Sequence, residues 1–219
     1  FFVLISTITL EKKAKMKDKI VIITGANKGI GKEAAKQIAK LGAKVYMACR
    51  SLDSSNQARE EIVNETKNQN VFVRHLGHQL LTQILLHELK NAAPSRIINT
   101  ASHFAGGLDI DDINFYKRNY NETLAYKQTK QANRMLTREW ARRLEKDNIS
   151  VYSMTPGFIP DTELFREQNV VGKFLLKVFA LIEGRTIEEG ADTIVWLASA
   201  EKIIESNGGF YNQRKEEKC

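Results

Sequence analysis

The stretch KIVIITGANKGIGKEAA, which begins at Lys19, constrains the fold of this chain more than any other. Its first part, KIVIITG, is a short apolar run that ends in glycine, which is typical of a fully buried strand. Gly25, Gly29 and Gly31 follow with the spacing G-x-x-x-G-x-G and lead into an amphipathic helix expected at about 30–41. Glycine permits the tight turn and lets the backbone approach a pyrophosphate at the helix N-terminus. This order of strand, glycine loop and helix predicts a dinucleotide-binding unit.

A P-loop is the nearest alternative, and the residues exclude it. A P-loop requires G-x-x-x-x-G-K-[ST], in which the Ser or Thr binds magnesium. Here Ala26 stands at the position of the first glycine, and Glu33 stands where Ser or Thr is required. A glycine-rich turn that binds no ligand stays open as an interpretation.

Strand and helix signals alternate along the rest of the chain. Further strands are expected in AKVYMACR, at Val71–Val73, in SRIINTAS, in ISVYSMTPG and in GGFYN, and further helices at about 51–69, 76–92, 122–146, 163–183 and 187–200. This alternation is typical of an α/β fold with a doubly wound parallel sheet, Rossmann-like in its connections. We therefore expect a single domain over residues 19–219.

Residues 1–18 precede this domain as an apolar and then basic extension. FFVLISTITL has ten residues, whereas a helix that spans a bilayer needs about 20. The lysines of EKKAKMKDK follow it, and such charges mark the cytoplasmic side of a membrane segment. One interpretation is the remnant of an anchor, which associates the protein with the cytoplasmic face of a membrane such as the endoplasmic reticulum. The other is an extension without a membrane role, and the sequence leaves both open.

Composition narrows the compartment and the partners. Cys49 and Cys219 are too few for a disulfide framework, so a reducing, cytoplasmic compartment is expected. The net charge of +7 arises from basic residues that are interleaved with glutamates and do not alternate with aromatic residues. Binding to nucleic acid is therefore not expected. The four histidines lack acidic or cysteine partners at ligand spacing, so no metal site is expected either.

The end of the second strand indicates which nicotinamide cofactor the chain would bind. A site for NAD places Asp or Glu there to bind the ribose 2′-hydroxyl, whereas a basic residue accommodates the 2′-phosphate of NADP. This chain has Cys49-Arg50-Ser51 at that point and Lys28 in the glycine loop. Both positive charges favour NADP, although a solvated charge at a strand end stays open as an interpretation of Arg50.

Tyr126 and Lys130 lie four residues apart on the expected long helix, and thus on one face of it. A free tyrosine has a pKa of about 10, and a nearby ammonium group lowers it, so that the tyrosine can exchange a proton near neutral pH. Ser102 ends the preceding strand, where its hydroxyl can bind a carbonyl oxygen. Taken alone, the Tyr-x-x-x-Lys spacing is common on helix surfaces. Behind a glycine loop and a strand that ends in serine, it indicates an acid–base site.

These motifs together resemble the short-chain dehydrogenase/reductase family, and within it the retinol dehydrogenase group. The segments that carry the resemblance are TGANKGIGKEAA, VYMACR, HLGHQLLTQILL, APSRIINTAS, AYKQTKQAN, ARRLE and SVYSMTPG, in the family's order, over about residues 17–215. The resemblance implies an NADP-dependent oxidoreductase that interconverts an alcohol and a carbonyl. An apolar substrate such as a retinoid, steroid or fatty aldehyde would fit the apolar residues 165–182, where the family forms its substrate lid. Core packing or a membrane-facing patch explains those residues equally well.

The resemblance also implies a role for each site residue. Tyr126 is the acid/base, Lys130 binds the nicotinamide ribose and lowers the tyrosine pKa, and Ser102 orients the substrate oxygen. The residues implied for the cofactor are Gly25, Asn27, Lys28, Gly29, Ile30 and Gly31 at its phosphates, Arg50 at the 2′-phosphate, and Pro156, Gly157, Phe158 and Ile159 along the nicotinamide.

One part of the family pattern is missing after residue 73. In the family, the third strand is followed by a helix, by a central strand that ends in Asn-Asn-Ala-Gly, and by a further helix that carries a catalytic Asn. Here Val73 is followed at once by RHLGH, with Arg74 in the place of that Asn, and about 60 residues are absent relative to a usual domain of this kind. Because the missing strand belongs at the sheet centre, we expect the edges of two buried strands to be left unpaired. We also expect Arg74 and His75 to be too short to connect the far edge of the sheet to the next helix.

Two functions follow from these observations. The first is the NADP-dependent oxidoreductase. The second is a non-catalytic, truncated member of the family that acts through dimerisation, because the helices expected at about 76–91 and 122–146 are those that the family uses for dimers.

Overall fold

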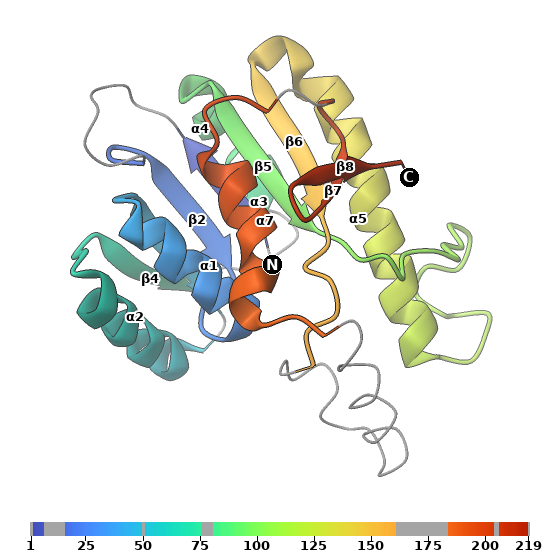
Figure 1. Cartoon of the computed structure of the whole chain (residues 1–219). Coiled ribbons are helices and arrows are strands. Elements are labelled where there is room, and N and C mark those ends of the chain that lie inside the picture. The colour runs from blue at the N-terminus through green and yellow to red at the C-terminus, as the bar shows by residue number, and fades with distance from the viewer. Residues whose placement is uncertain are drawn as a thin grey trace.

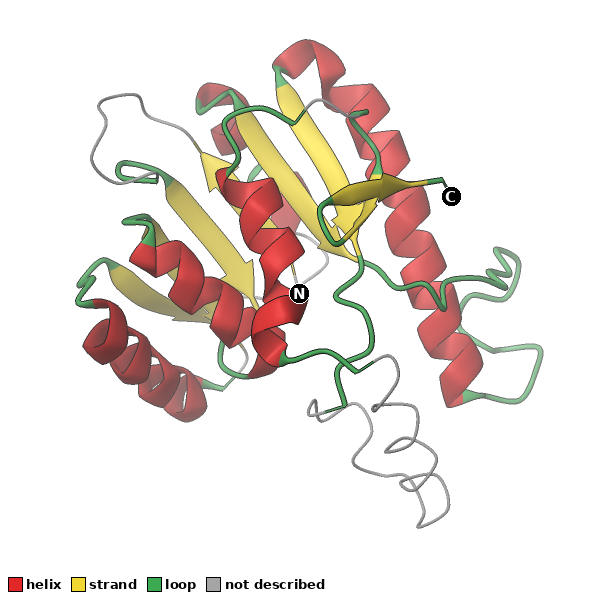
Figure 2. Cartoon of the chain, viewed as in Figure 1, coloured by secondary structure: helices red, strands yellow, loops and turns green. Residues whose placement is uncertain are grey.

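The described residues form an α/β molecule with an eight-stranded sheet and helices on both faces of it (Figure 1, Figure 2). The computed structural model describes residues 2–6, 16–49, 51–75, 81–160, 184–203 and 206–218. The strands are β1 (Phe2–Ser6), β2 (Ile20–Thr24), β3 (Lys44–Cys49), β4 (Val71–His75), β5 (Ser95–Thr100), β6 (Ile149–Met154), β7 (Phe210–Asn212) and β8 (Lys215–Glu217). The helices are α1 (Gly29–Lys40), α2 (Leu52–Thr66), α3 (Leu81–Ile84), α4 (Leu86–Asn91), α5 (Glu122–Leu144), the 3-10 helix η1 (Glu145–Asp147) and α7 (Ile187–Ser199).

The strand order is β4-β3-β2-β1-β5-β6-β7-β8. Strands β2, β3 and β4 are parallel to one another, and so are β5, β6 and β7. The sequence-based prediction of a doubly wound α/β fold is thus confirmed, with two antiparallel additions, β1 and β8.

Two apolar clusters, one on each face of the sheet, explain why the sequences of the strands are continuous apolar runs. On one face, α1 and α7 pack together and against the sheet, with Ile38, Met47 and Ile194 fully buried. On the other face, α4 and α5 pack against β5 and β6 through a second cluster that includes Leu89 and Leu144. A central strand that faces helices on both sides has no solvent-exposed side to carry polar residues.

The centre of the sheet is filled by β1, which corrects the expectation of unpaired strand edges. Strand β1 runs antiparallel between β2 and β5, and Leu4 pairs with Ile22 on one side and with Ile97 on the other. Residues 2–6, which the sequence analysis placed in the N-terminal extension, therefore belong to the sheet. A strand in this slot satisfies the backbone groups of both neighbours. It can do so in the antiparallel direction because adjacent antiparallel strands need only a loop between them.

The junction after β4 also differs from the expectation. Strand β4 stays at the edge of the sheet beside β3, where Arg74 pairs with Ala48 and His75 with Cys49. The two residues that were expected to form the bridge are therefore part of the strand, because β3 still offers them hydrogen-bonding partners. The expected helix at about 76–92 is described from Leu81 onward, where it forms α3 and α4 with an interruption at Leu85. Residues 76–80 lie outside the described part of the chain.

The remaining elements agree closely with the predicted ones. Helix α5 covers most of the expected 122–146, and α7 covers most of the expected 187–200. The expected helix at 163–183 lies outside the described residues. No helix in the described ranges has both the length and the apolar character that a membrane crossing requires.

Candidate active site

The predicted site residues follow three strands that end at the same edge of the sheet. The glycine loop follows β2, Ser102 follows β5, and Pro156 follows β6. Strands β2 and β5 point the same way, because β1 is antiparallel to both, and β6 is parallel to β5. Ligands of open α/β sheets bind at the edge where the carboxyl ends of the strands meet. The fold thus brings these three segments to one edge.

The glycine loop depends on its glycines for reasons of conformation and of space. Gly25 and Gly29 have φ angles of 63° and 55°, in the left-handed region that glycine tolerates best. A Cβ atom at Gly31 would stand 2.3 Å from the carbonyl oxygen of Gly25. The Gly25 amide donates a hydrogen bond to the Ala48 carbonyl at 3.0 Å, which ties the start of the loop to the end of β3.

Helix α1 begins without a side-chain cap, unlike α5 and α7. Lys28 at its N-cap makes no side-chain cap hydrogen bond, and the first turn holds no acidic residue. In contrast, Asn121 caps α5 and Thr186 caps α7. A Cβ atom at Gly29 would meet nothing within 4 Å, so the space beside the first turn is open. The first-turn N–H groups of α1 can therefore bind phosphate oxygens, and the loop fits the pyrophosphate of a dinucleotide.

Other loop residues hold this arrangement. The Asn27 side chain donates to Ser54 Oγ on α2 at 3.0 Å, and Ile30 packs against the main apolar cluster. Lys28 is exposed at the rim. Arg50, which the sequence analysis assigned to the 2′-phosphate, lies outside the described residues.

Tyr126 and Lys130 lie together on α5, as their spacing predicts. The Lys130 Nζ atom is 5.5 Å from the centre of the Tyr126 ring. The same atom donates a hydrogen bond to the Thr100 carbonyl at 3.2 Å, and Asn133 Nδ2 donates to that carbonyl at 3.0 Å. Burial lowers the pKa of the Lys130 ammonium below its ordinary value. These bonds fix the lysine at the end of β5, two residues before Ser102.

Ser102 is buried, with 7% of its surface exposed. Its Oγ atom accepts a hydrogen bond from the Phe104 amide at 3.2 Å, which leaves the hydroxyl hydrogen for another acceptor. The Ser102 carbonyl accepts a hydrogen bond from Arg134 Nη2 of α5 at 2.8 Å. Within the described residues, no hydrogen bond joins Ser102 to Tyr126 directly.

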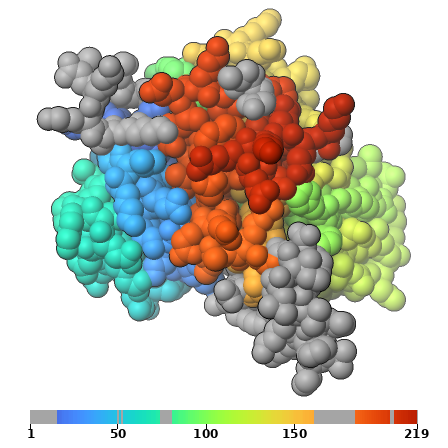
Figure 3. Space-filling view, in the orientation of Figure 1, coloured from blue at the N-terminus to red at the C-terminus, as the bar shows by residue number. Residues whose placement is uncertain are grey.

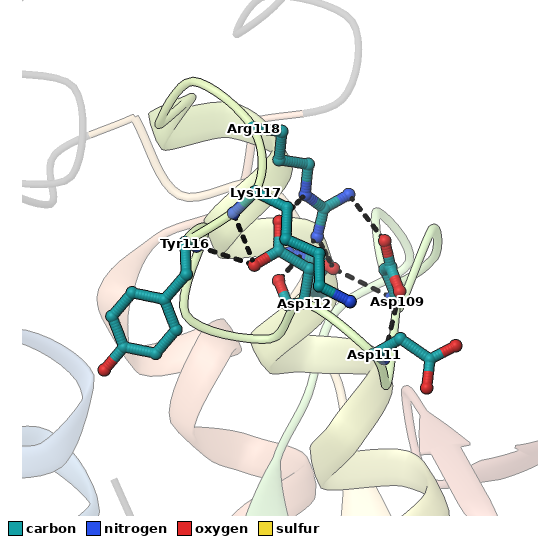
Figure 4. A network of polar contacts seen from close by, with 7 residues as sticks. Asp109, Asp111, Asp112, Tyr116, Lys117 and Arg118 are labelled. Atoms are coloured by element: carbon teal, nitrogen blue, oxygen red, sulfur yellow. Dashed lines mark hydrogen bonds and ion pairs between the residues drawn. The ribbon is translucent and has the colours of Figure 1, made fainter.

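A polar network fixes the loop that leads from Ser102 to Tyr126 (Figure 4). Asp112 is buried, and its Oδ1 atom accepts hydrogen bonds from the amides of Tyr116 and Lys117 at 2.6 and 3.1 Å. Arg118 Nη2 donates to Gln128 Oε1 of α5 at 2.9 Å and to the Asp112 carbonyl at 3.0 Å. The loop is therefore attached to α5 two residues beyond Tyr126. This network was not predicted from the sequence, where its one local signal is the acidic and basic residues of DDINFYKR.

The segment predicted to lie along the nicotinamide is packed between β6 and α7. Gly157 has a φ angle of 79°, and the Arg185 guanidinium covers it so closely that a Cβ atom there would stand 2.6 Å from Nη1. The Arg185 amide donates to the Phe158 carbonyl at 2.8 Å. Ile159 is buried against Gly190 of α7. Its side chain therefore faces the core, and the backbone of this segment is the part that can face a ligand.

The other predicted features are placed only in part. The apolar residues 165–182 lie outside the described ranges. Within those ranges, no group of three or more His, Cys, Asp or Glu side chains is arranged to hold a metal ion. The His87 ring hydrogen-bonds with the Asn91 side chain, and the His103 ring with the Glu217 carboxylate.

A protein-family model matches most of the chain. The model described as short chain dehydrogenase matches residues 19–76 and 68–170. The two matched ranges overlap at residues 68–76, around the end of β4. Two pieces of the family pattern thus meet at the junction where the sequence lacks a strand and a helix.

Curated relatives align along almost the whole chain. Retinol dehydrogenase 13 of Homo sapiens is 32% identical over 93% of this chain and 79% of its own length. Retinol dehydrogenase 11 of Mus musculus is 33% identical over 89% of this chain and 77% of its own length. The first alignment spans 263 residues, more than the 219 residues of this chain, so the relative has residues without a counterpart here.

Solved structures share the fold at low sequence identity. L-sorbose reductase from Gluconobacter frateurii, complexed with NADPH and L-sorbose, superposes with a TM-score of 0.68 at 21% identity, over 90% of this chain and 95% of its own. An NADPH-bound short chain oxidoreductase from Pseudomonas aeruginosa reaches 0.70 at 12% identity, over 90% and 96%. The family match, the identity to curated relatives and the shared fold together establish that this chain belongs to the short-chain dehydrogenase family.

Proposed function

We propose that the protein is an NADP-dependent oxidoreductase that interconverts an alcohol and a carbonyl. One observation carries this proposal: Lys130 lies beside Tyr126 and is bonded to the carbonyl of Thr100, two residues before the buried Ser102. We infer from these contacts that Tyr126, Lys130 and Ser102 act together at the end of β5. The uncapped glycine loop ends at the same edge of the sheet.

The bound nicotinamide supplies the hydride. In the direction of reduction, Tyr126 donates its phenolic proton to the carbonyl oxygen, which becomes the hydroxyl of the product. Ser102 donates a hydrogen bond to the same oxygen and orients the substrate. The Lys130 ammonium stabilises the phenolate that remains, because an opposite charge nearby favours the ionised form. In the direction of oxidation, Tyr126 takes the proton back.

The substrate class that we propose is an apolar alcohol or carbonyl, such as a retinoid, a steroid or a fatty aldehyde. The names of the curated relatives support this class, since both are retinol dehydrogenases. The apolar composition of residues 165–182 is compatible with it. We place the protein in the cytoplasm, as the two cysteines indicate. Residues 2–6 pair within the sheet between β2 and β5.

Binding of NADPH should be at least about tenfold tighter than binding of NADH, because cationic side chains at the rim attract the 2′-phosphate. Lys28, exposed at the N-cap of α1, is the described residue that carries this preference. Titration of both cofactors, followed by cofactor fluorescence, measures the ratio. Lys28→Ala should reduce this ratio, because it should weaken binding of NADPH and leave binding of NADH unchanged. Equal or tighter binding of NADH would overturn the choice of NADP.

Gly31→Ala should raise the Kd for NADPH at least about tenfold, which corresponds to about 1.4 kcal/mol. The new Cβ atom would stand 2.3 Å from the Gly25 carbonyl oxygen, so the loop must move away from the geometry that receives the phosphates. The same titration measures the effect. Lys40→Ala, an exposed change at the other end of α1, is the control and should leave the Kd unchanged. An unaltered Kd for Gly31→Ala would place the cofactor elsewhere.

The second candidate is a non-catalytic member of the family that acts by pairing with another copy or with a relative. Exposed apolar side chains on α3 and α5 favour it: Ile84, Met135 and Leu136 are 67%, 49% and 52% exposed. The NADPH titration separates the two candidates. A lack of saturable binding at high micromolar NADPH would remove the enzyme and leave the pairing function.

A further inference from the structure

Arg134 is a half-buried arginine of α5, and its side chain contacts the backbone of Ser102. Its Nη2 atom donates to the Ser102 carbonyl at 2.8 Å, and its guanidinium carbon lies 3.7 Å from the centre of the Phe210 ring of β7. Its Nε atom is buried and has no hydrogen-bond partner in the described part of the chain. The stacking on Phe210 and the bond to Ser102 therefore fix the plane of the guanidinium.

His103, the next residue after Ser102, is held by the same C-terminal hairpin. Its Nε2 atom lies 2.6 Å from Glu217 Oε2 of β8, and its ring packs edge-on against Phe210 at 5.6 Å. The hairpin β7–β8 thus contacts both Arg134 and His103. In the space-filling view, the C-terminal residues (red) lie against the body of the molecule beside the green residues that follow β5 (Figure 3).

The charges in this cluster are complementary. Burial alone would raise the pKa of the Glu217 carboxyl, but hydrogen bonds from Asn212 and His103 and the positive charges of His103 and Arg134 outweigh burial, so this pKa is lowered. Glu217 is therefore an anion at neutral pH and lies close to the positive charge of Arg134.

The spacing of donors along α5 explains what this cluster does. Lys130 and Asn133 bind the Thr100 carbonyl, and Arg134, one position further on the same face, binds the Ser102 carbonyl. Carbonyls two residues apart in an extended chain point to the same side. The last ladder bond between β5 and β6 in this region is from the Ala101 amide to the Met154 carbonyl, at 2.7 Å. Ser102 lies beyond that bond, and its carbonyl accepts hydrogen bonds from Arg134 Nη2 at 2.8 Å and from the Ala105 amide at 3.2 Å. Arg134 is thus the contact that ties the Ser102 backbone to α5.

We propose that Arg134 is a positioning residue, which together with the hairpin β7–β8 fixes Ser102 so that its hydroxyl faces the substrate oxygen. The proposal rests on the proposed oxidoreductase function and adds the C-terminal hairpin to the site. Arg134 touches neither substrate nor cofactor, and it acts only through the Ser102 backbone.

Arg134→Met and Arg134→Lys test this role, with Arg142→Met as the matched control on an exposed turn of the same helix. Arg134→Met should lower kcat about 100-fold, the scale expected when a reacting group is displaced by about 1 Å. The Kd for NADPH should not change, because the glycine loop is untouched. Arg134→Lys should recover part of the loss, since an ammonium group keeps one donor but not the flat stacking on Phe210. Arg142→Met should behave as the unaltered protein.

A second readout makes the test independent of turnover. Hydrogen exchange at the amides of Ala101 and Ala105, which donate to Met154 and Ser102 carbonyls, should accelerate at least about tenfold in Arg134→Met and not in Arg142→Met. An unchanged kcat in Arg134→Met, or a rise in KM and Kd at constant kcat, would overturn the proposal. If the unaltered protein neither binds NADPH nor turns over, the proposed function fails. Amide exchange then decides the role of Arg134 alone, and unchanged exchange in Arg134→Met overturns it.

Discussion

Tyr126→Phe should lower kcat for carbonyl reduction by about 10²–10⁴-fold, the usual contribution of a positioned general acid. The substitution removes only the phenolic hydroxyl and keeps the ring beside Lys130, whose Nζ atom lies 5.5 Å from the ring centre. The Kd for NADPH should stay unchanged, because the substitution leaves the glycine loop, the proposed phosphate site, intact. Steady-state oxidation of NADPH with an aldehyde such as a retinal, together with cofactor titration, measures both quantities.

Tyr116→Phe is the control for this experiment. It is the same chemical change in the loop that precedes α5, at a side chain that is 87% exposed. Its kcat should match that of the unaltered protein. An undiminished kcat in Tyr126→Phe would remove Tyr126 from the acid–base role, whereas a rise in Kd alone would assign it to cofactor binding.

Leu4→Pro should lower the free energy of unfolding by about 2–4 kcal/mol, from one lost ladder hydrogen bond and one buried carbonyl left without a partner. Leu4 lies in the middle of β1, with Ile22 on one side and Ile97 on the other. In a strand with neighbours on both sides, each N–H group pairs with one neighbour or the other. Proline removes that group in the centre of the sheet. Unfolding by urea, with the midpoint and slope fitted together, measures the change.

Leu4→Val is the control, because it keeps the N–H group and a strand-forming side chain. It removes one methylene, and should cost about 0.5–1.5 kcal/mol, as deletion of a single methylene usually does. Amide exchange in β2 and β5 should accelerate in Leu4→Pro and stay slow in Leu4→Val. Equal stability of both variants would show that the slot between β2 and β5 is not filled by residues 2–6.

Much of the fold was predictable because its signals are local. The apolar run at β2, the glycines of the following loop and the apolar face of α1 lie within about two dozen consecutive residues, and each reports its own backbone conformation. The same holds for the spacing of Tyr126 and Lys130, which the helix converts directly into proximity. These features required no knowledge of the rest of the chain.

The centre of the sheet was not predictable from such signals. Residues 2–6 read FVLIS, a short apolar run without alternation of polar and apolar residues. Such a run occurs both in apolar extensions and in buried strands, so the sequence alone does not distinguish the two. A strand can pair only with neighbouring strands whose N–H and C=O groups are not already bonded to another segment. The absence of the family's central strand creates that vacancy far along the chain, and β1 fills it from the N-terminal end.

The supporting contacts of the site were not predictable for a similar reason. Arg134 and Phe210, and likewise His103 and Glu217, are distant in the sequence and meet only because the hairpin β7–β8 returns to the end of β5. On its own, Arg134 reads as one more cation on a long, strongly charged helix. The contact with Ser102 exists only when α5 packs against the sheet at this register.

The sequence by itself determined the family, the glycine loop and the pairing of Tyr126 with Lys130, because glycine conformation and helical spacing are properties of short segments. Only the tertiary structure decided how the sheet closes over the missing strand and how Ser102 is held. Both depend on hydrogen-bonding groups that distant segments offer to one another, and such groups find their partners only when the whole sheet is assembled.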